Sequence, residues 1–254
     1  MLSADQIIQY QASPTLLQDR IILITGAGDG IGKAASMACA AAGAKVILAG
    51  RTVAKLEQVY DDILAAQGHE PVIYPIDLEG ATEDDYNELA LNIDNQFGRL
   101  DGLLLNAGIL GQRTPLSNYR QDVWDRVIKV NVTAQFQMTQ ALMPVLEKSA
   151  DASVIFTSSG VGKVGRAFWG AYAVSKFAIE GMVQTWAAEL EDLGSVRLNA
   201  IDPGATATTM RAQAFPAENP NDLKTAAEIM PTYLYLLGPD STGVNGQSIK
   251  AQNR

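Results

Sequence analysis

Short apolar runs without internal polar alternation recur along this 254-residue chain and are separated by longer stretches with helical spacing. A strand that is apolar at every position needs cover on both faces, as strands of a parallel sheet have. The stretches between the runs are long enough for the crossover helices that join parallel strands. The pattern predicts an α/β fold, a doubly wound parallel sheet with helices on both faces. The six predicted strands are Ile21–Thr25, Val46–Ala49, Val72–Ile76, Gly102–Asn106, Val154–Ser158 and Val196–Ile201.

Helical spacing and segment lengths give the rest of the predicted organisation. We expect residues 19–254 to form a single domain, because their number suits one α/β unit. Residues 1–18 are predicted to be an irregular extension, and the segment from 204 to about 230 a mobile loop or short helix beside the substrate. A seventh strand is predicted near Gly246–Ala251. The predicted helices are Gly30–Ala42, Thr52–Gln67, Thr82–Phe97, Asp122–Glu147, Trp169–Leu193 and one around Thr225–Leu237.

Composition disfavours several classes of partner, metal site and location in the cell. A formal net charge of −9 disfavours binding to nucleic acid or to anionic membranes. Cys39 is the only cysteine and His69 the only histidine, so neither a disulfide nor a zinc cluster is expected, and no metal. The first nineteen residues contain no Lys or Arg, unlike a signal peptide, and the most apolar stretch is too short to cross a membrane. We therefore expect a cytoplasmic protein.

A glycine-rich turn follows the first predicted strand and leads into a helix. Gly26 permits a tight turn, Gly30 lets the backbone approach a pyrophosphate, and Gly32 lets the helix lie close to the strand. The free N–H groups of the helix start can bind phosphate without basic side chains. Glycine turns also serve ordinary sharp loops, so this motif needs support from elsewhere. The residues expected to contact the cofactor here are Gly26, Gly28, Asp29, Gly30, Ile31 and Gly32.

The end of the second predicted strand bears on the choice between NAD and NADP. NAD-binding chains usually carry an acidic residue there that accepts hydrogen bonds from the ribose. This chain has Gly50-Arg51-Thr52, and the guanidinium of Arg51 can pair with a 2′-phosphate. The pattern favours NADP(H). A preference for NAD stays open for two reasons. Arg51 could be an ordinary solvent-facing residue, and the acidic Asp29 lies in the glycine turn, where NADP-binding relatives often have a basic residue.

Three residues form a candidate catalytic group. Ser159 ends a predicted strand, and Tyr172 and Lys176 follow with the four-residue spacing that places two side chains on one face of a helix. The ordinary pKa of tyrosine is near ~10, and a neighbouring Lys ammonium together with a cationic nicotinamide can lower it. Tyr172 can then act as a general acid or base. The spacing alone is common by chance, but Asn106-Ala107-Gly108 ends another strand at the same predicted sheet edge.

These motifs, in this order and spacing over residues 19–251, resemble the short-chain dehydrogenase/reductase family with its Rossmann-type fold. Within it the chain is similar to the YciK-like bacterial oxidoreductases. The resemblance implies NADP(H)-dependent hydride transfer between the nicotinamide and a carbonyl or alcohol carbon of a small molecule. It implies that Tyr172 transfers the proton, Ser159 binds the substrate oxygen, Lys176 binds the nicotinamide ribose and Asn131 supports a proton relay.

The same resemblance assigns further cofactor contacts. Asp77 and Leu78 are expected at the adenine, and Asn106, Ala107 and Gly108 beside the adenosine ribose. Pro203, Gly204, Thr206 and Thr208 are expected at the nicotinamide end. Leu105 departs from the family, which often has an Asn there, and its side chain is expected simply to pack. A homodimer or homotetramer built on the two longest predicted helices is implied as well.

Two other functions are less well supported by the sequence. The alternative is a redox sensor or regulator that binds NADP without turnover, which the complete set of Ser159, Tyr172 and Lys176 disfavours. Sugar epimerisation usually needs a C-terminal domain larger than the segment after Pro203. Arg166 and Trp169 could line the pocket mouth, where they would favour an anionic or aromatic substrate, or could be ordinary surface and packing residues.

Overall fold

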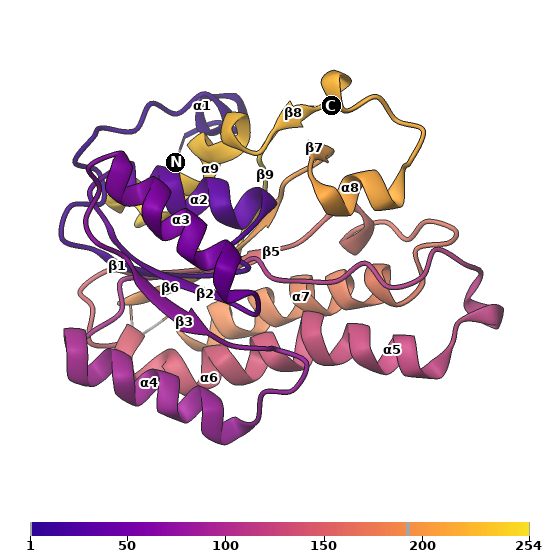
Figure 1. Cartoon of the computed structure of the whole chain (residues 1–254), viewed down its shortest axis with the longest axis horizontal. Coiled ribbons are helices and arrows are strands. Elements are labelled where there is room, and N and C mark those ends of the chain that lie inside the picture. The colour runs from indigo at the N-terminus through magenta and orange to yellow at the C-terminus, as the bar shows by residue number, and fades with distance from the viewer. Residues whose placement is uncertain (1, 192–193, 254) are drawn as a thin grey trace.

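The computed structural model of the chain describes residues 2–191 and 194–253 and is built around one parallel sheet (Figure 1). Seven strands of this described part pair in the order β3-β2-β1-β4-β5-β6-β9, and every pairing in the sheet is parallel. The doubly wound fold predicted from the sequence is confirmed, and so is the seventh strand. The strands are β1 (Ile21–Thr25), β2 (Lys45–Gly50), β3 (Val72–Pro75), β4 (Gly102–Leu105), β5 (Ala152–Thr157), β6 (Val196–Asp202) and β9 (Ser248–Lys250).

Helices cover both faces of the sheet, as Figure 1 shows. Alternate residues of β1 face opposite sides, because successive side chains of a strand point to opposite faces. Leu23 packs in the core on the side of α4 and α6, whereas Ile22 and Ile24 pack in the core on the side of α2 and α9; none of the three is exposed. The helices are α2 (Gly30–Ala41), α3 (Val53–Ala65) and α9 (Met230–Leu237) on one face and α4 (Glu83–Phe97), α6 (Ala134–Leu146) and α7 (Gly170–Glu189) on the other.

The helix predicted at Asp122–Glu147 is not a uniform α-helix. It consists of α5 (Gln121–Ile128), a π-helical turn (Lys129–Thr133) and then α6. Asn131 lies in the π-turn and is fully buried; its side-chain amide bonds both backbone polar groups of Ile109. Such single π-turns are frequent at functional sites. Hydrophobic spacing could not reveal this turn. The predicted end of the next helix, Leu193, lies outside the described residues.

Two segments are more ordered than the sequence suggested. The stretch before residue 19 includes α1 (Ala4–Ile8), which begins with a capping box between Ser3 and Gln6. Between residues 204 and 230, β7 (Thr206–Ala207) pairs with β8 (Lys224–Thr225) and encloses α8 (Thr209–Ala214). Short turns of 3₁₀-helix lie at Leu116–Asn118, Gly160–Gly162, Pro220–Asp222, Ala227–Ile229 and Pro239–Ser241.

Sheet order places the site. The chain leaves β1 toward β2 on one side, and later returns to place β4 on its other side. Crossover connections therefore run in opposite directions from the carboxyl ends of β1 and β4, and a crevice opens between them. The glycine turn and the segment 106–110 form its two banks.

A pair of helix glycines tests how closely the glycine turn is packed. A Cβ at Gly32 would lie 2.1 Å from the carbonyl oxygen of Gly26, whereas a Cβ at Gly181 in α7 would meet nothing within 4 Å. We expect Gly32→Ala to destabilise the fold by ~1–3 kcal/mol through overpacking. The matched Gly181→Ala should stabilise it by ~0.5–1 kcal/mol. Thermal unfolding measures both, and a Gly32→Ala protein as stable as wild type would contradict the packing described.

Candidate active site

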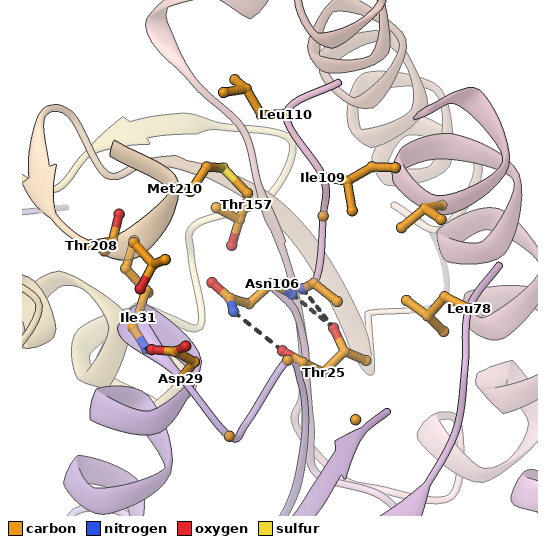
Figure 2. A pocket seen from close by; sticks show the side chains of 18 of the residues that line it. Thr25, Asp29, Ile31, Leu78, Asn106, Ile109, Leu110, Thr157, Thr208 and Met210 are labelled. Carbon is orange, nitrogen blue, oxygen red and sulfur yellow. Dashed lines mark hydrogen bonds between the residues drawn. The ribbon is translucent and has the colours of Figure 1, made fainter. Parts of the chain in front are cut away.

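A cavity of about 530 Å³ lies at the carboxyl ends of the strands and extends from the glycine turn to α8 (Figure 2). It brings together nearly all the site residues predicted from the sequence. Two do not line it: Gly32 lies behind the glycine turn, and Asn131 lies behind the segment 106–110. The predicted residues that line it are Gly26, Gly28, Asp29, Gly30, Ile31, Arg51, Asp77, Leu78, Asn106, Ala107, Gly108, Ser159, Tyr172, Lys176, Pro203, Gly204, Thr206 and Thr208.

Thr25 joins the two banks of the crevice. Its hydroxyl accepts hydrogen bonds from the backbone N–H groups of Asn106 at 2.9 Å and Ala107 at 3.0 Å. The Asn106 side chain donates to the Thr25 carbonyl at 3.2 Å, and Figure 2 shows all three bonds at the cavity floor. Asn106 thus holds the ends of β1 and β4 together, which leaves Gly26 and Ala107 in near contact.

The glycine turn has the backbone that its sequence predicts. Gly26 and Gly30 have φ of +67° and +51°, in the left-handed region that favours glycine. A Cβ at Gly26 would come within 3.2 Å of Ala107 Cα, so the turn lies tightly against the opposite bank. Helix α2 starts here, and the backbone of Gly26, Gly28 and Gly30 lines the cavity at its N-terminus, an arrangement suited to a pyrophosphate.

Asp29 is not a free negative charge at this turn. Its carboxylate caps α2 by accepting from Gly30 N at 2.7 Å, and it pairs with the Lys55 ammonium at 2.6 Å. The hydrogen bond with Lys55 is the main cause that lowers the pKa of Asp29. The pair is neutral overall. Lys55 also lines the cavity, but it was not predicted from the sequence. Its position four residues after Arg51, at the start of a helix, could have indicated a second basic residue at this end.

Three of the predicted site residues, Arg51, Asp77 and Leu78, line the end of the cavity near β2 and β3. Arg51 is exposed, lines the cavity, and takes part in none of the salt bridges recorded for residues 2–191 and 194–253. Asp77 is exposed and caps the turn after β3 by accepting from Glu79 N at 3.2 Å. Leu78 is buried and supplies an apolar wall. The Arg51 guanidinium is therefore available to an anionic group at this end.

The candidate catalytic residues meet at the other end. Ser159 follows β5 and Tyr172 lies in the first turn of α7, and both line the same end of the cavity. Lys176 lies one helical turn after Tyr172, with its ammonium 5.5 Å from the phenol ring centroid. That ammonium donates to the carbonyl oxygen of Thr157 at 2.7 Å. A substrate oxygen placed between Ser159 and Tyr172 can contact both hydroxyl groups.

Burial decides the ionisation of these groups. It raises the pKa of Tyr172 to about 12, against a smaller opposing effect of the Ser159 hydrogen bond. It lowers the pKa of Lys176 to about 8. Burial outweighs the other influences on the phenol, and the lowering of its pKa by Lys176 together with a cationic nicotinamide stays a prediction. A phenol that stays protonated at neutral pH is suited to donating a proton.

Asn131 and its neighbours support the site from behind. Its side chain accepts from Ile109 N at 2.8 Å and donates to Ile109 O at 2.9 Å and to Ser175 Oγ at 3.1 Å. A Cβ at Gly108 would come within 3.3 Å of Asn131 Oδ1 and 3.8 Å of Lys176 Nζ. Asn131 thus sets the path of the 106–110 segment beside Lys176. Ser175 was missed, since only a contact across helices reveals it.

The segment after β6 closes the cavity opposite the glycine turn. Gln252 donates to the carbonyl oxygens of Pro203 at 2.6 Å and Ala205 at 3.1 Å, which fixes the turn where Gly204 has a φ of +68°. Thr206 is buried and donates to the Pro203 carbonyl. Thr208 caps α8 and faces the glycine turn, its Cγ2 lying 3.4 Å from the position of a Gly30 Cβ.

Nowhere in residues 2–191 and 194–253 do three or more His, Cys, Asp or Glu side chains cluster as metal ligands. In the same residues no helix has the length and apolar character needed to cross a membrane. Cys39 is buried, and burial raises its pKa to about 12.

Comparison with known families agrees with this geometry. The model of the short chain dehydrogenase family matches residues 20–219, which include every candidate catalytic residue. The chain belongs to the short chain dehydrogenase family. It is therefore a member of an oxidoreductase family whose fold and motif order it shares.

Individual relatives match over nearly the whole of this short chain dehydrogenase. It is 50% identical to the oxidoreductase YciK of Escherichia coli strain K12 over 96% of both chains. A short chain dehydrogenase from Pseudomonas syringae is 56% identical, with a TM-score of 0.94 over 96% of this chain and 98% of that one. One from Shigella flexneri, complexed with NADP, is 50% identical, with a TM-score of 0.93 over 95% of this chain and 100% of that one.

The buried ammonium of Lys176 predicts a pH-dependent stability difference. Its pKa falls from an ordinary 10.5 to about 8 in the fold, so between these values the unfolded chain binds the extra proton. The contribution of Lys176 to stability therefore rises as the pH increases from about 8 to 10.5. We expect the melting temperature of wild type to gain on that of Lys176→Met across this window. Lys148→Met, which removes an exposed ammonium, is the control. A difference that stays constant or moves the other way would contradict the burial of a charged Lys176.

Proposed function

We propose that the chain is an NADP(H)-dependent oxidoreductase that interconverts carbonyl and alcohol groups of small molecules. One observation carries the proposal: Ser159, Tyr172 and Lys176 meet at one end of a single cavity whose other end holds the glycine turn and Arg51. A dinucleotide can span these two ends. The nicotinamide end then lies beside the candidate proton donor.

The residues present fit NADP(H). A Cβ at Gly26 would come within 3.2 Å of Ala107 Cα, and one at Gly32 would clash with the Gly26 carbonyl, so only glycine allows the tight backbone path that suits a pyrophosphate. Arg51 lines the far end and gives it positive charge suited to a 2′-phosphate. Asp29 does not oppose this, since Lys55 neutralises it. The Shigella flexneri relative complexed with NADP supports the same choice.

The chemistry of reduction follows from the arrangement. Bound NADPH supplies a hydride to the carbonyl carbon, the C=O π bond opens toward oxygen, and NADP⁺ and an alcohol remain. Tyr172 donates its phenolic proton to that oxygen. The raised pKa of Tyr172 keeps the phenol protonated until then. Ser159 hydrogen-bonds the same oxygen and places it. Lys176, held by the Thr157 carbonyl, keeps an ammonium beside the phenol and can stabilise the phenolate that proton transfer leaves.

The remaining parts of the proposal concern the protein as a whole. Residues 19–254 act as one domain in the cytoplasm, and the chain assembles as a homodimer or homotetramer. Support for assembly comes from α6 and α7, which expose Phe136 by 41% and Phe177 by 45%. Burying such side chains between copies would gain apolar contact.

Replacing the proton donor tests the mechanism. Tyr172→Phe removes only the hydroxyl, so turnover of any carbonyl substrate should fall by at least ~100-fold while NADPH affinity stays nearly unchanged. Steady-state NADPH oxidation and calorimetric binding measure the two. Near-wild-type kcat in the variant would contradict the role of Tyr172.

Arg51 tests the cofactor choice. A charge-assisted contact of ~1.5–3 kcal/mol with the 2′-phosphate corresponds to ~10- to 150-fold tighter binding of NADPH than NADH. At equal subsaturating concentrations NADPH should raise the melting temperature more than NADH does, and Arg51→Ala should remove most of the difference. Lys148→Ala removes a cation that pairs with Asp94 away from the cavity and should leave it intact. Equal shifts by both nucleotides in wild type would overturn the NADP assignment.

A further inference from the structure

We propose that the substrate is an apolar, ring-bearing ketone or aldehyde whose ring lies against Trp169. This inference rests on the proposed function and specifies the substrate class of the same site. It is drawn from the side chains that surround Tyr172 on the side of the cavity away from the glycine turn.

The wall next to Tyr172 is apolar and aromatic. Val161, Tyr172 and Ala173 form a small buried cluster, against which Leu110, Trp169 and Met210 pack. Leu110, Trp169 and Met210 all line the cavity, and Figure 2 shows Leu110 and Met210 beyond Asn106, at the end away from Asp29. The Trp169 ring centroid lies 5.6 Å from that of Tyr172. A ring attached to the reacting carbonyl would therefore contact Trp169.

Polar partners for a hydroxylated substrate are scarce on this side. Among the described lining residues near Tyr172, Arg211 is engaged by Glu218 in two bonds of 2.6 and 2.7 Å. Ser158 donates to the buried Glu180. Gln213 is exposed at the mouth. Ser159, Tyr172 and the Thr157 hydroxyl, which has no hydrogen-bond partner among the described residues, are left as polar groups. So few groups suit one carbonyl oxygen better than the several hydroxyl groups of a sugar, because unpaired hydroxyl groups are costly to bury.

Trp169 is held in place before any substrate arrives. The guanidinium of Arg113 lies 4.4 Å from the Trp169 ring centroid and 4.9 Å from that of Phe215, and it donates to the Ala214 carbonyl at 2.8 Å. Arg113 thereby joins the segment after β4 to α8 across the aromatic pair. Preorganised aromatic surface binds a ring at a low entropic cost. Arg166, which the sequence also suggested for the mouth, is exposed and does not line the cavity.

The backbone before Tyr172 is shaped to present this wall. Phe168 has a φ of +69°, rare for a bulky residue, and Gly170 a φ of +42°. A Cβ at Gly170 would lie 2.2 Å from the Tyr119 ring, so that ring packs directly on the start of α7. The Tyr119 hydroxyl accepts from Gln112 N at 3.0 Å, next to Arg113. Strained backbone of this kind persists where surrounding contacts enforce it.

A matched panel of ketones tests the substrate class. With NADPH, kcat/KM for acetophenone should exceed the values for propanone and 1,3-dihydroxypropanone by at least ~10-fold, because a buried ring removes apolar area from water. Trp169→Ala should reduce this preference by ~5- to 10-fold, and Trp169→Phe should largely keep it. Trp186→Phe changes an indole that stacks on Phe136 outside the cavity lining and is the control. A preference unchanged in Trp169→Ala would overturn the role of Trp169.

A binding measurement separates this inference from the proposed function. In Tyr172→Phe saturated with NADPH, calorimetry should detect acetophenone at concentrations where propanone does not bind. Acetophenone binding without turnover of any ketone by wild type would support the substrate class and contradict the proposed reaction. Turnover of propanone or 1,3-dihydroxypropanone as efficient as that of acetophenone would overturn the substrate class and leave the reaction standing. Failure of acetophenone to bind would also overturn it.

Discussion

The candidate site depends on the hydrogen bonds that Thr25 makes with Asn106 and Ala107. They join the carboxyl ends of β1 and β4, the two neighbouring strands from which the chain departs in opposite directions. With those ends held at hydrogen-bonding distance, the glycine turn must pass so close to Ala107 that no side chain fits on Gly26. The crevice that results is lined by the backbone of the glycine turn. The surface proposed for the pyrophosphate is thus built largely from the backbone of Gly26, Gly28 and Gly30.

Positively charged side chains line the cavity at the end where a cofactor with a 2′-phosphate must be distinguished from one without it. The chain has a net charge of −9, yet Arg51 and Lys55 both line the β2 end of the cavity. Lys55 neutralises Asp29, and Asp29 in turn caps α2, so the acidic residue in the glycine turn serves the helix without repelling a phosphate. At the opposite end burial acts in place of charge. It keeps the Tyr172 phenol protonated and makes the Lys176 ammonium easier to deprotonate.

The sequence predicted the fold and most of the cavity because both depend on local signals. Continuous apolar runs gave the sheet, and the glycine spacing, the strand-end Asn106 and the Tyr172–Lys176 spacing gave residues that do meet at one edge. What escaped prediction depends on contacts between distant segments. The π-turn around Asn131, the pairing of Lys55 with Asp29, and the stacking of Arg113 on Trp169 arise from packing that no single segment encodes. The depth at which Tyr172 is buried, which raises the pKa of its phenol, was not visible in the sequence either.

Direct hydride transfer to a carbonyl carbon is the central claim of this account. Incubating the enzyme with acetophenone and NADPH deuterated at nicotinamide C4, on the transferable face, and analysing the alcohol by mass spectrometry tests it most directly. The account predicts 1-phenylethanol carrying one deuterium on the carbinol carbon and none from D₂O when the label is moved to the solvent. An alcohol whose carbinol hydrogen comes from solvent, or no alcohol from any carbonyl compound supplied, would contradict it.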